Sequence, residues 1–357
     1  MRELAREISA TLDATVADPA LAARTLTDAA LIEQIDTRVM ELPAEVRHAM
    51  RLPATATGAA IVSRLPLADN EFGPTPSSPQ EAAQWSGDPA RRAHSLEFDI
   101  VMLLLARSAG EPFGWEGHQD GRLVNNILPV AGHEHEQSGV SSRAQLSPHT
   151  EDAFHPRRAH LLMLGCIRNP DLVGTTVSSA RYVELSAVQR ELLSTPALPI
   201  LPDVSYGEEY DRHSAVLIPT LWTATGPDEQ TMRFDPAYTP LKNADPEFRA
   251  AYERLAEELE RVRVTAVLAP GEVLLVDNDV AVHGRVPFTA RYDGTDRWLK
   301  LVNVWLPQRS RRVEEADESG YGERIVAPFR SVSASMVERR TDDRLMAPND
   351  RGILEQP

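Results

Sequence analysis

The sequence predicts a mainly β protein with flanking helices. Short apolar runs alternate with Pro- and Gly-containing segments through the middle and second half of the chain, which is typical of a sandwich or barrel. Amphipathic helical patterns precede these runs and separate two of them. With 357 residues and 42% hydrophobic content, the chain can form one large domain or two ordinary ones.

The expected helices lie mainly in the first third of the chain. Residues 1–52 repeat apolar side chains at helical spacing, and 91–110 show the same period. The clearest helical pattern covers 245–263. The segment 68–90 is expected to be a loop, because its prolines interrupt both helices and central strands.

Strands are expected where apolar and β-branched residues form short runs. The best candidates are 124–129, 159–167, 175–179, 272–277 and 298–305. From residue 309 onward the chain is rich in Arg, Glu and Asp. We therefore expect a single domain over 1–308 with a helical N-terminal portion, followed by a polar C-terminal extension over 309–357.

Composition limits the partners and the compartment. A net charge of -16, from 37 basic and 53 acidic residues, argues against binding to a nucleic-acid backbone. No apolar run approaches the roughly 18 residues that a membrane span requires, and the acidic N-terminus does not resemble a secretory signal. The single cysteine, Cys166, cannot form an intramolecular disulfide, which is typical of a reducing compartment. We expect a cytoplasmic protein with neither nucleic-acid nor membrane partners.

A candidate metal site combines His149, Glu151 and a distant His283. In an extended segment, positions 149 and 151 face the same side. Gly284, after His283, lets the backbone turn close to a bound group. Two imidazoles and one carboxylate form the ligand set of non-haem Fe(II) oxygenases. A His-x-Glu triplet alone is weak support, so the hypothesis depends on the combination with His283 and with Arg297.

Arg297 stands at the start of the expected strand 298–305. Its guanidinium suits bidentate binding of a carboxylate. The alternative is a surface ion pair with Asp293 or Asp296. A second group of ligand-type residues, 133–136, lies in a Gly- and Ser-flanked segment and is expected to be a solvated loop.

Five sequence blocks between residues 95 and 310 resemble the clavaminate synthase-like family of Fe(II)/2-oxoglutarate oxygenases, and within it the arginine, asparagine and lysine hydroxylases. The blocks are 119–122, 149–154, 168–171, 276–285 and 291–300. The resemblance implies a double-stranded β-helix, or distorted jelly roll, and makes the region 1–308 an oxygenase domain.

The resemblance also implies roles for individual residues. His149, Glu151 and His283 would hold Fe(II), and Arg297, with Thr175 as its hydroxyl partner, would bind the far carboxylate of the cosubstrate 2-oxoglutarate. With O2, such a centre would hydroxylate an unactivated C–H bond. The expected substrate contacts are His118, Gln119, Asp235 and Leu301.

The sequence departs from the family pattern at the substrate contacts. Hydroxylases of free amino acids have an Arg, which holds the α-carboxylate, where this chain has Leu301. His118 replaces a Gln that contacts the α-groups. Asp235 remains from an acidic pair that grips a guanidinium, but Ala237 replaces the second acid. An apolar side chain cannot pair with a carboxylate, and burying an unpaired carboxylate is costly.

These departures favour an amino-acid-derived substrate whose carboxylate is masked. A cyclic dipeptide, a peptide or an aminoacyl group on a carrier protein would fit, within natural-product (antibiotic) biosynthesis. The alternative is a free L-amino acid such as arginine, with Arg285, Lys300 or Arg122 supplying the missing charge. Other classes also remain open at this point: a non-catalytic jelly-roll binding protein, and a zinc hydrolase that would not need Arg297.

Overall fold

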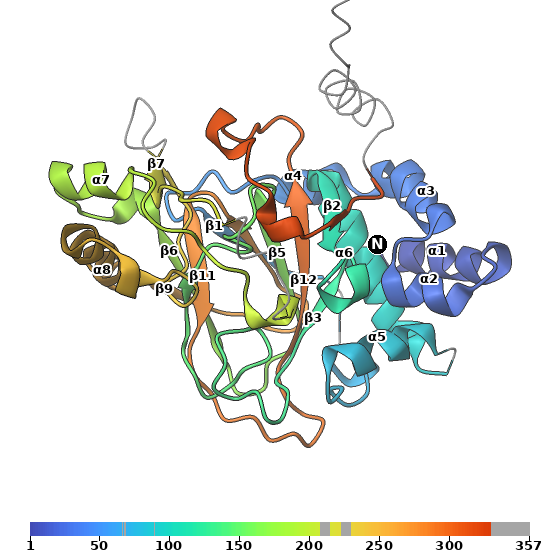
Figure 1. Ribbon diagram of the computed structural model, residues 1–357. Coiled ribbons are helices and arrows are strands. Elements are labelled where there is room, and N and C mark those ends of the chain that lie inside the picture. Colours follow the sequence, from blue (N-terminus) through green and yellow to red (C-terminus); the bar gives the residue numbers. More distant parts are fainter. Residues whose placement is uncertain (66, 68, 89, 208–214, 223–229, 330–357) are drawn as a thin grey trace, which may run out of the picture.

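The computed structural model describes the whole chain except residues 66, 68, 89, 208–214, 223–229 and 330–357. Two antiparallel sheets form its centre, and helices cover their outer faces (Figure 1). Apolar side chains of both sheets form one shared core cluster, which includes Leu162, Leu164, Val177 and Leu299. The two sheets therefore face each other across a common interior.

The larger sheet contains most of the strands. Its order is β1 (Ala59–Val62), β10 (Val273–Asp277), β5 (Leu161–Arg168), β12 (Trp298–Trp305), β2 (Glu111–Trp115) and β13 (Ile325–Val326), with β3 (Asn125–Ile127) also paired to β12. The smaller sheet has the order β4 (Leu146–His149), β11 (Ala281–Arg285), β6 (Gly174–Ser179) and β9 (Val264–Val267). The short strands β7 (Leu221–Trp222) and β8 (Thr231–Met232) pair only with each other.

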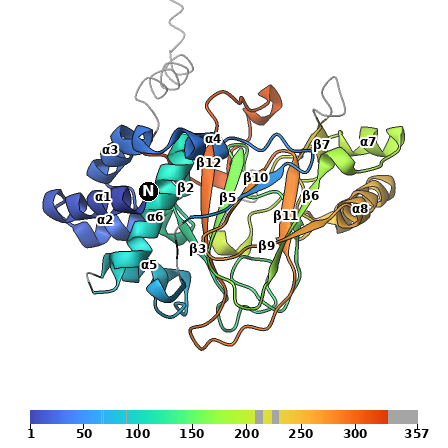
Figure 2. The ribbon, with the colours of Figure 1, turned by 180° about the vertical axis from the view of Figure 1, so that it is seen from behind.

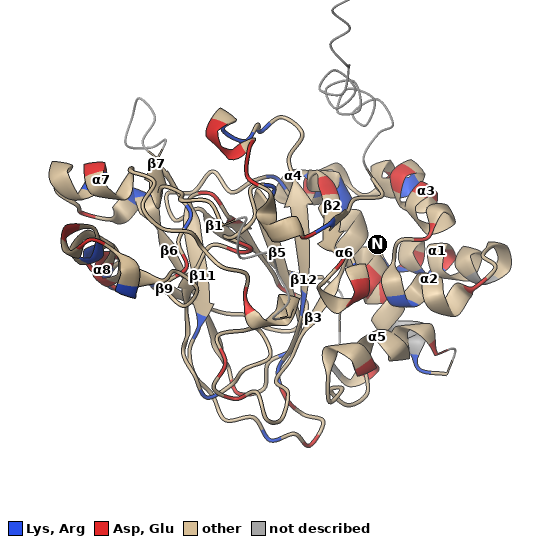
Figure 3. Cartoon of the chain, viewed as in Figure 1, with Lys and Arg blue, Asp and Glu red and all other residues tan. Residues whose placement is uncertain are grey.

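Helices form an outer layer on each side. The layer over the larger sheet contains α1 (Arg2–Thr15), α2 (Pro19–Thr25), α3 (Ala29–Arg38), α4 (Ala44–Ala49), α5 (Pro79–Gly87) and α6 (Arg92–Ala109) (Figure 2). On the opposite side, α7 (Ala187–Leu193) and α8 (Pro246–Arg261) pack on the smaller sheet through Val282. Lys, Arg, Asp and Glu lie along the outer helices of both layers (Figure 3).

The expected helices are present, but the first region is divided. Residues 2–49 form four helices. Asp18 and Asp28 each accept backbone hydrogen bonds and begin α2 and α3, and α4 follows Pro43. The long helices α6 and α8 and the strand β12 match their expected ranges closely. Within the described residues, no helix is both long and apolar enough to cross a bilayer.

The expectation of a loop over 68–90 is wrong for its second half. Helix α5 begins at Pro79, and the Ser78 hydroxyl accepts the Glu81 N–H at 3.1 Å. Proline at the first helical position loses no hydrogen bond, because that N–H would have no partner within the helix. Here the proline marks the start of a helix.

The first part of the expected C-terminal extension folds against the body. Glu315 is buried and its Oε1 lies 2.7 Å from Arg158 Nη1 and 3.3 Å from Arg233 Nη1. Strand β13 pairs with β2. Residues 309–329 therefore contact both the larger sheet and the segment around Arg233, whereas 330–357 lie outside the described residues.

Candidate metal centre

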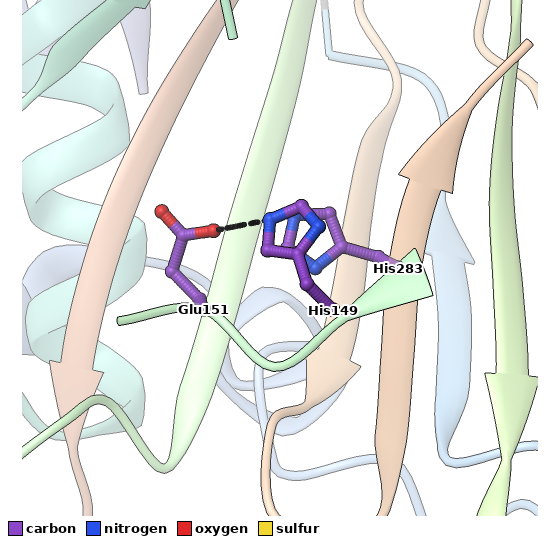
Figure 4. A group of neighbouring side chains, drawn as sticks. All are labelled: His149, Glu151 and His283. Atoms are coloured by element: carbon purple, nitrogen blue, oxygen red, sulfur yellow. Dashed lines mark ion pairs between the residues drawn. The ribbon is translucent and has the colours of Figure 1, made fainter. Parts of the chain in front are cut away.

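The three candidate metal ligands meet at the edge of the smaller sheet. Strands β4 and β11 pair in a register that sets His149 opposite His283, with ring centroids 4.4 Å apart. Glu151 follows β4 in a turn and points at both rings (Figure 4). Its Oε2 lies 3.5 Å from His149 Nε2 and 3.3 Å from His283 Nε2. One ligand atom from each residue lies within 4.8 Å of the other two, so the group can hold one metal ion.

The orientation of His149 suits metal binding. Its Nδ1 lies 2.9 Å from the carbonyl oxygen of Ser147, which can only accept a hydrogen bond. Nδ1 therefore carries a proton, and Nε2, the nitrogen that faces Glu151, is the one that can bind a metal ion. Such a hydrogen bond on the far ring nitrogen is usual for metal-bound histidine.

The electrostatics of the group show that a cation belongs between these side chains. Burial alone would raise the pKa of Glu151, but His149 and His283 lower it well below its usual range. Burial opposes charge on His149 as well, yet Glu151 raises its pKa to about 9. Burial and the neighbouring His149 lower the pKa of His283. A divalent cation suits the two imidazole nitrogens and the carboxylate oxygen that meet here.

A pocket between the two sheets contains this group. Its empty volume is about 970 Å³, including its open mouth. All the site residues expected from the sequence line it: His118, Gln119, His149, Glu151, Thr175, Asp235, His283, Arg297 and Leu301. The tertiary structure thus assembles segments that lie more than half the chain apart.

Arg297 is buried at the start of β12, with 6% of its surface exposed. Its Nη2 donates to Thr175 Oγ1 at 3.0 Å, and its Nε has no partner. Among the described residues no carboxylate pairs with it; Asp296 instead accepts backbone N–H groups of 291 and 292. The surface ion pair considered for Arg297 is therefore wrong. Burial lowers its pKa to about 10. A buried guanidinium without an acid fits a carboxylate ligand.

The remaining expected contacts line the pocket in different ways. The Gln119 amide is held by Asn126, accepting its N–H at 2.9 Å and donating to its carbonyl at 3.0 Å. His118 precedes Gln119, and its ring packs against that of Tyr206 with centroids 5.5 Å apart and a tilt of 49°. Leu301 adds an apolar wall on β12.

Asp235 lies beside the metal ligands because its segment pairs with theirs. The Thr150 N–H donates to the Phe234 carbonyl at 2.8 Å, and the Phe234 N–H donates to Thr150 Oγ1 at 3.2 Å. Asp235 Oδ1 accepts the N–H groups of 237 and 238. Burial raises the pKa of Asp235 to about 6.

Sequence reasoning missed a second acid in the pocket, Asp203. It lies before the short 3-10 turn Val204–Tyr206, and both Asp203 and Ser205 line the pocket. Asp203 Oδ1 accepts the Ser205 N–H at 2.6 Å. In the sequence this pattern signals only a capped turn. Ala237 lacks the carboxylate that the family pattern has at this position. Asp203, from another segment, supplies a second carboxylate to the same pocket.

Position 301 is Leu in this chain, where related hydroxylases have an Arg. Of the three cations that could supply the missing charge, two lie outside the pocket. Lys300 and Arg122 both pair with Asp99, in a fully buried cluster beneath the larger sheet. The Lys300 Nζ lies 2.8 Å from Asp99 Oδ1. Only Arg285 of these three lines the pocket.

Other segments singled out in the sequence differ in whether they contribute to the pocket. His133 and Glu136 pair with each other at 2.7 Å in a largely exposed turn, as expected for a solvated loop. The sequence offers two long segments, 68–90 and 205–232, that could close over the pocket as a lid. The described part of 68–90 contributes no residue to the pocket. The other, 205–232, contributes Ser205, and its stretches 208–214 and 223–229 lie outside the described residues.

The two sheets, with a 2-His-1-carboxylate group between them, define the class of a non-haem metal oxygenase. The family model "Taurine catabolism dioxygenase TauD, TfdA family" matches residues 102–304, and the chain belongs to this family of enzymes. The match covers the metal ligands, the pocket walls and Arg297.

Two similar proteins are amino-acid hydroxylases by name. The chain is 36% identical over 295 residues to an enduracididine beta-hydroxylase from Streptomyces hygroscopicus, covering 76% of this chain and 84% of the relative. It is 33% identical over 273 residues to an L-ornithine/L-arginine 3-hydroxylase from Catenulispora acidiphila, covering 71% and 78%.

A solved relative matches the whole fold. The non-heme iron oxygenase OrfP, crystallised with Fe, succinate and (3S)-hydroxy-L-Arg, superposes with a TM-score of 0.70 at 33% identity, covering 85% of this chain and 91% of that one. The same enzyme has been solved with Fe and alpha-ketoglutaric acid. The described architecture, mostly sheet with outer helices, is that of these oxygenases.

Proposed function

We propose that this chain is an Fe(II)/2-oxoglutarate-dependent oxygenase that hydroxylates an unactivated C–H bond of an amino-acid-derived substrate with a masked carboxylate, in natural-product biosynthesis. The observation that carries the proposal is the buried Arg297, which pairs with no carboxylate of the described residues and faces the same pocket as the His-Glu-His group. The two sheets would form the walls of a distorted jelly roll, in an oxygenase domain spanning 1–308.

The residues divide into a metal end and a cosubstrate end. His149, Glu151 and His283 hold the iron from one side and leave its other positions open to the pocket. Arg297 and Thr175 bind the distal carboxylate of 2-oxoglutarate. When bound, iron and 2-oxoglutarate supply the oxidising power that inserts one atom of O2 into a C–H bond. Leu164, Leu299 and Leu301 line the remaining wall and exclude water.

The substrate end of the pocket is acidic. Asp203 and Asp235 both line it, and no Lys or Arg of the described residues pairs with either. A cationic group such as a guanidinium or an amine fits this pair. Position 301 offers an apolar side chain, so the substrate carboxylate is best masked as an amide, ester or thioester. Cyclic dipeptides, peptides and aminoacyl groups on a carrier protein have this chemistry.

The second candidate substrate is a free cationic amino acid, and one observation favours it. The relatives named above act on arginine-like amino acids, and the solved relative holds a hydroxyarginine. Arg285 is the pocket cation, apart from Arg297, that would have to receive its carboxylate.

One experiment tests the reaction class, and a second tests the substrate. Anaerobic 2-oxoglutarate added to the Fe(II)-loaded protein is expected to give a weak visible charge-transfer band, and Arg297→Leu is expected to lose it at the same concentration. If the iron-loaded wild type gives no band, the proposal fails.

The substrate screen compares free arginine with three forms whose carboxylate is masked: arginine amide, arginine loaded on a carrier domain, and a cyclic dipeptide containing arginine, in which the α-amine is acylated as well. We expect a 2-oxoglutarate-dependent mass gain of one oxygen in the masked members, with succinate formed in step. Turnover of free arginine at a higher kcat/KM than every masked form would replace the first candidate by the second.

A further inference from the structure

A second buried guanidinium, that of Arg285, lies at the cosubstrate end of the pocket. Arg285 ends strand β11 two positions after His283, so both side chains face the same side of the strand. Its register partner on β6 is Thr175, the residue that accepts a hydrogen bond from Arg297. Arg285, Thr175 and Arg297 thus converge on one end of the pocket, which all three line.

The contacts of Arg285 hold its side chain but leave its charge unbalanced. Its Nη1 donates to the Ser141 carbonyl, and its Nη2 donates to Ser141 Oγ at 3.1 Å and to the Ala144 carbonyl at 2.8 Å. The ring of Phe288 lies 5.0 Å from its guanidinium carbon. All these partners are neutral, and its Nε has none. Among the described residues no carboxylate pairs with Arg285, which is only 3% exposed.

Arg285 and Arg297 are two buried cations on one end of the pocket, and no carboxylate of the described residues pairs with either. This arrangement is unfavourable without a bound anion. Each loses hydration, and each repels the other in a medium of low polarity. A bound anion relieves both costs at once. His283 of the metal group lies two residues before Arg285 on the same strand. A ligand that reaches both the metal and the two arginines therefore needs one acidic group at each end.

We propose that Arg285 is a second cosubstrate-positioning cation, which together with Arg297 makes this pocket selective for a 2-oxo dicarboxylate over a 2-oxo monocarboxylate. This inference rests on the proposed function. Arg297 makes the direct hydrogen bonds, and Arg285, fixed by Ser141 and Ala144, supplies charge and one free N–H. Two other roles compete with it: a purely structural brace for the segment 141–144, and a receptor for the carboxylate of a free amino-acid substrate.

Binding measurements separate these roles without using turnover. The protein, loaded anaerobically with Fe(II), is titrated with 2-oxoglutarate and with 2-oxobutyrate, which shares the 2-oxo acid head but lacks the distal carboxylate. Dissociation constants come from calorimetry and from the visible band. The variants are Arg285→Gln and Arg285→Lys, and the matched control is Arg143→Gln, an exposed arginine in the neighbouring segment.

For Arg285→Gln we expect 2-oxoglutarate binding to weaken by about tenfold or more, which corresponds to the loss of one charge interaction at intermediate polarity. The binding of 2-oxobutyrate should stay within about twofold. Arg285→Lys should retain much of the preference for the dicarboxylate, and Arg143→Gln should bind both ligands as the wild type does.

Several results would overturn the inference. If Arg285→Gln weakens the binding of 2-oxoglutarate and 2-oxobutyrate equally, Arg285 is a structural brace. If 2-oxoglutarate binding is unchanged and the binding of a free amino acid is lost, Arg285 is a receptor for the substrate carboxylate. If Arg285→Gln does not fold, Arg285→Lys decides: a folded Lys variant that loses the dicarboxylate preference contradicts the proposal. A wild type that binds no 2-oxoglutarate defeats the proposed function itself, whereas a binding wild type with an equally binding Arg285→Gln defeats only this inference.

Discussion

Asn278 holds the main chain of Glu151 from both sides. Its Oδ1 accepts the Glu151 N–H at 2.8 Å, and its Nδ2 donates to the Glu151 carbonyl at 3.0 Å. Asn278 is fully buried and also donates to the carbonyl of Ala159 at 3.1 Å. The carboxylate of the metal group is therefore positioned by a side chain 127 residues away, across the interior.

Replacing Asn278 should loosen the metal site without removing a ligand. For Asn278→Ala we expect metal affinity to fall by roughly 10- to 100-fold, because supporting hydrogen bonds around metal ligands have effects of this size. Titration with Fe(II) or Co(II) under anaerobic conditions measures it. Asn243→Ala, at an exposed position, is the control. Wild-type affinity in a folded Asn278→Ala protein would show that the turn after β4 orients Glu151 unaided.

The Thr175 hydroxyl should contribute to cosubstrate binding through Arg297. Thr175→Val keeps the shape but removes the acceptor of the 3.0 Å hydrogen bond. The loss of about 1 kcal/mol for one hydrogen bond predicts a roughly fivefold weaker 2-oxoglutarate affinity. The neighbouring Thr176→Val, on the other face of β6, should have no such effect. If both variants bind alike, Arg297 does not depend on this partner.

The acidic pair should make substrate binding depend on pH. Burial raises the pKa of Asp235 to about 6, so its carboxylate is neutral below that pH and anionic above it. For a cationic substrate, kcat/KM should therefore rise as the pH increases through about 6. Asp235→Asn should flatten this step and lower kcat/KM by roughly 10- to 100-fold, since hydrogen bonds to charged groups are worth about 1.5–3 kcal/mol. If kcat/KM of Asp235→Asn has the same pH profile as the wild type, the rise near pH 6 comes from another group.

The segment after residue 308 should stabilise the protein. Glu315 is buried between Arg158 and Arg233, and Glu315→Ala leaves both without this acid. Breaking such a buried pair typically costs about 3–5 kcal/mol of the free energy of unfolding. Denaturant unfolding measures this loss, and Glu314→Ala, at an exposed neighbouring position, is the control. A stable protein ending at residue 308 would contradict the prediction.

Glu315 also predicts how the free energy of unfolding changes at low pH. Burial alone would raise the pKa of Glu315, but Arg158 and Arg233 lower it to about 2. A carboxyl whose pKa is lower in the folded state stabilises the protein fully above its unfolded pKa of about 4.3. That contribution should disappear as the pH falls from there toward 2. Glu315→Ala should therefore unfold with a shallower pH dependence than the wild type over this window.

Some elements were readable because their signals are local. The periodic apolar faces of α6 and α8 and the apolar run of β12 are recorded in consecutive residues, and their ranges match closely. The strands β4 and β11 were not expected as such, because they are short and include the site residues themselves. Their stability comes from pairing across the sheet, β4 with β11 and β11 with β6, which no local pattern records.

The sequence alone determined the chemistry of the centre. The spacing of His149 and Glu151, with His283 and Arg297 later in the chain, indicated a 2-His-1-carboxylate site. The resemblance of five sequence blocks to the 2-oxoglutarate oxygenases implied that Arg297 binds a carboxylate. These residue types carry the chemistry, so their identities were informative before any geometry was known. The three ligand side chains do meet in the structure.

Only the tertiary structure decided which charges face the pocket. It directs Lys300 and Arg122 to Asp99 and away from the site, places Arg285 in the pocket with Arg297, and brings Asp203 into the pocket that Asp235 lines. The physical reason is that the energy of a charge depends on what surrounds it. Burial and pairing are set by segments far apart in the chain, and a residue's identity carries no record of either.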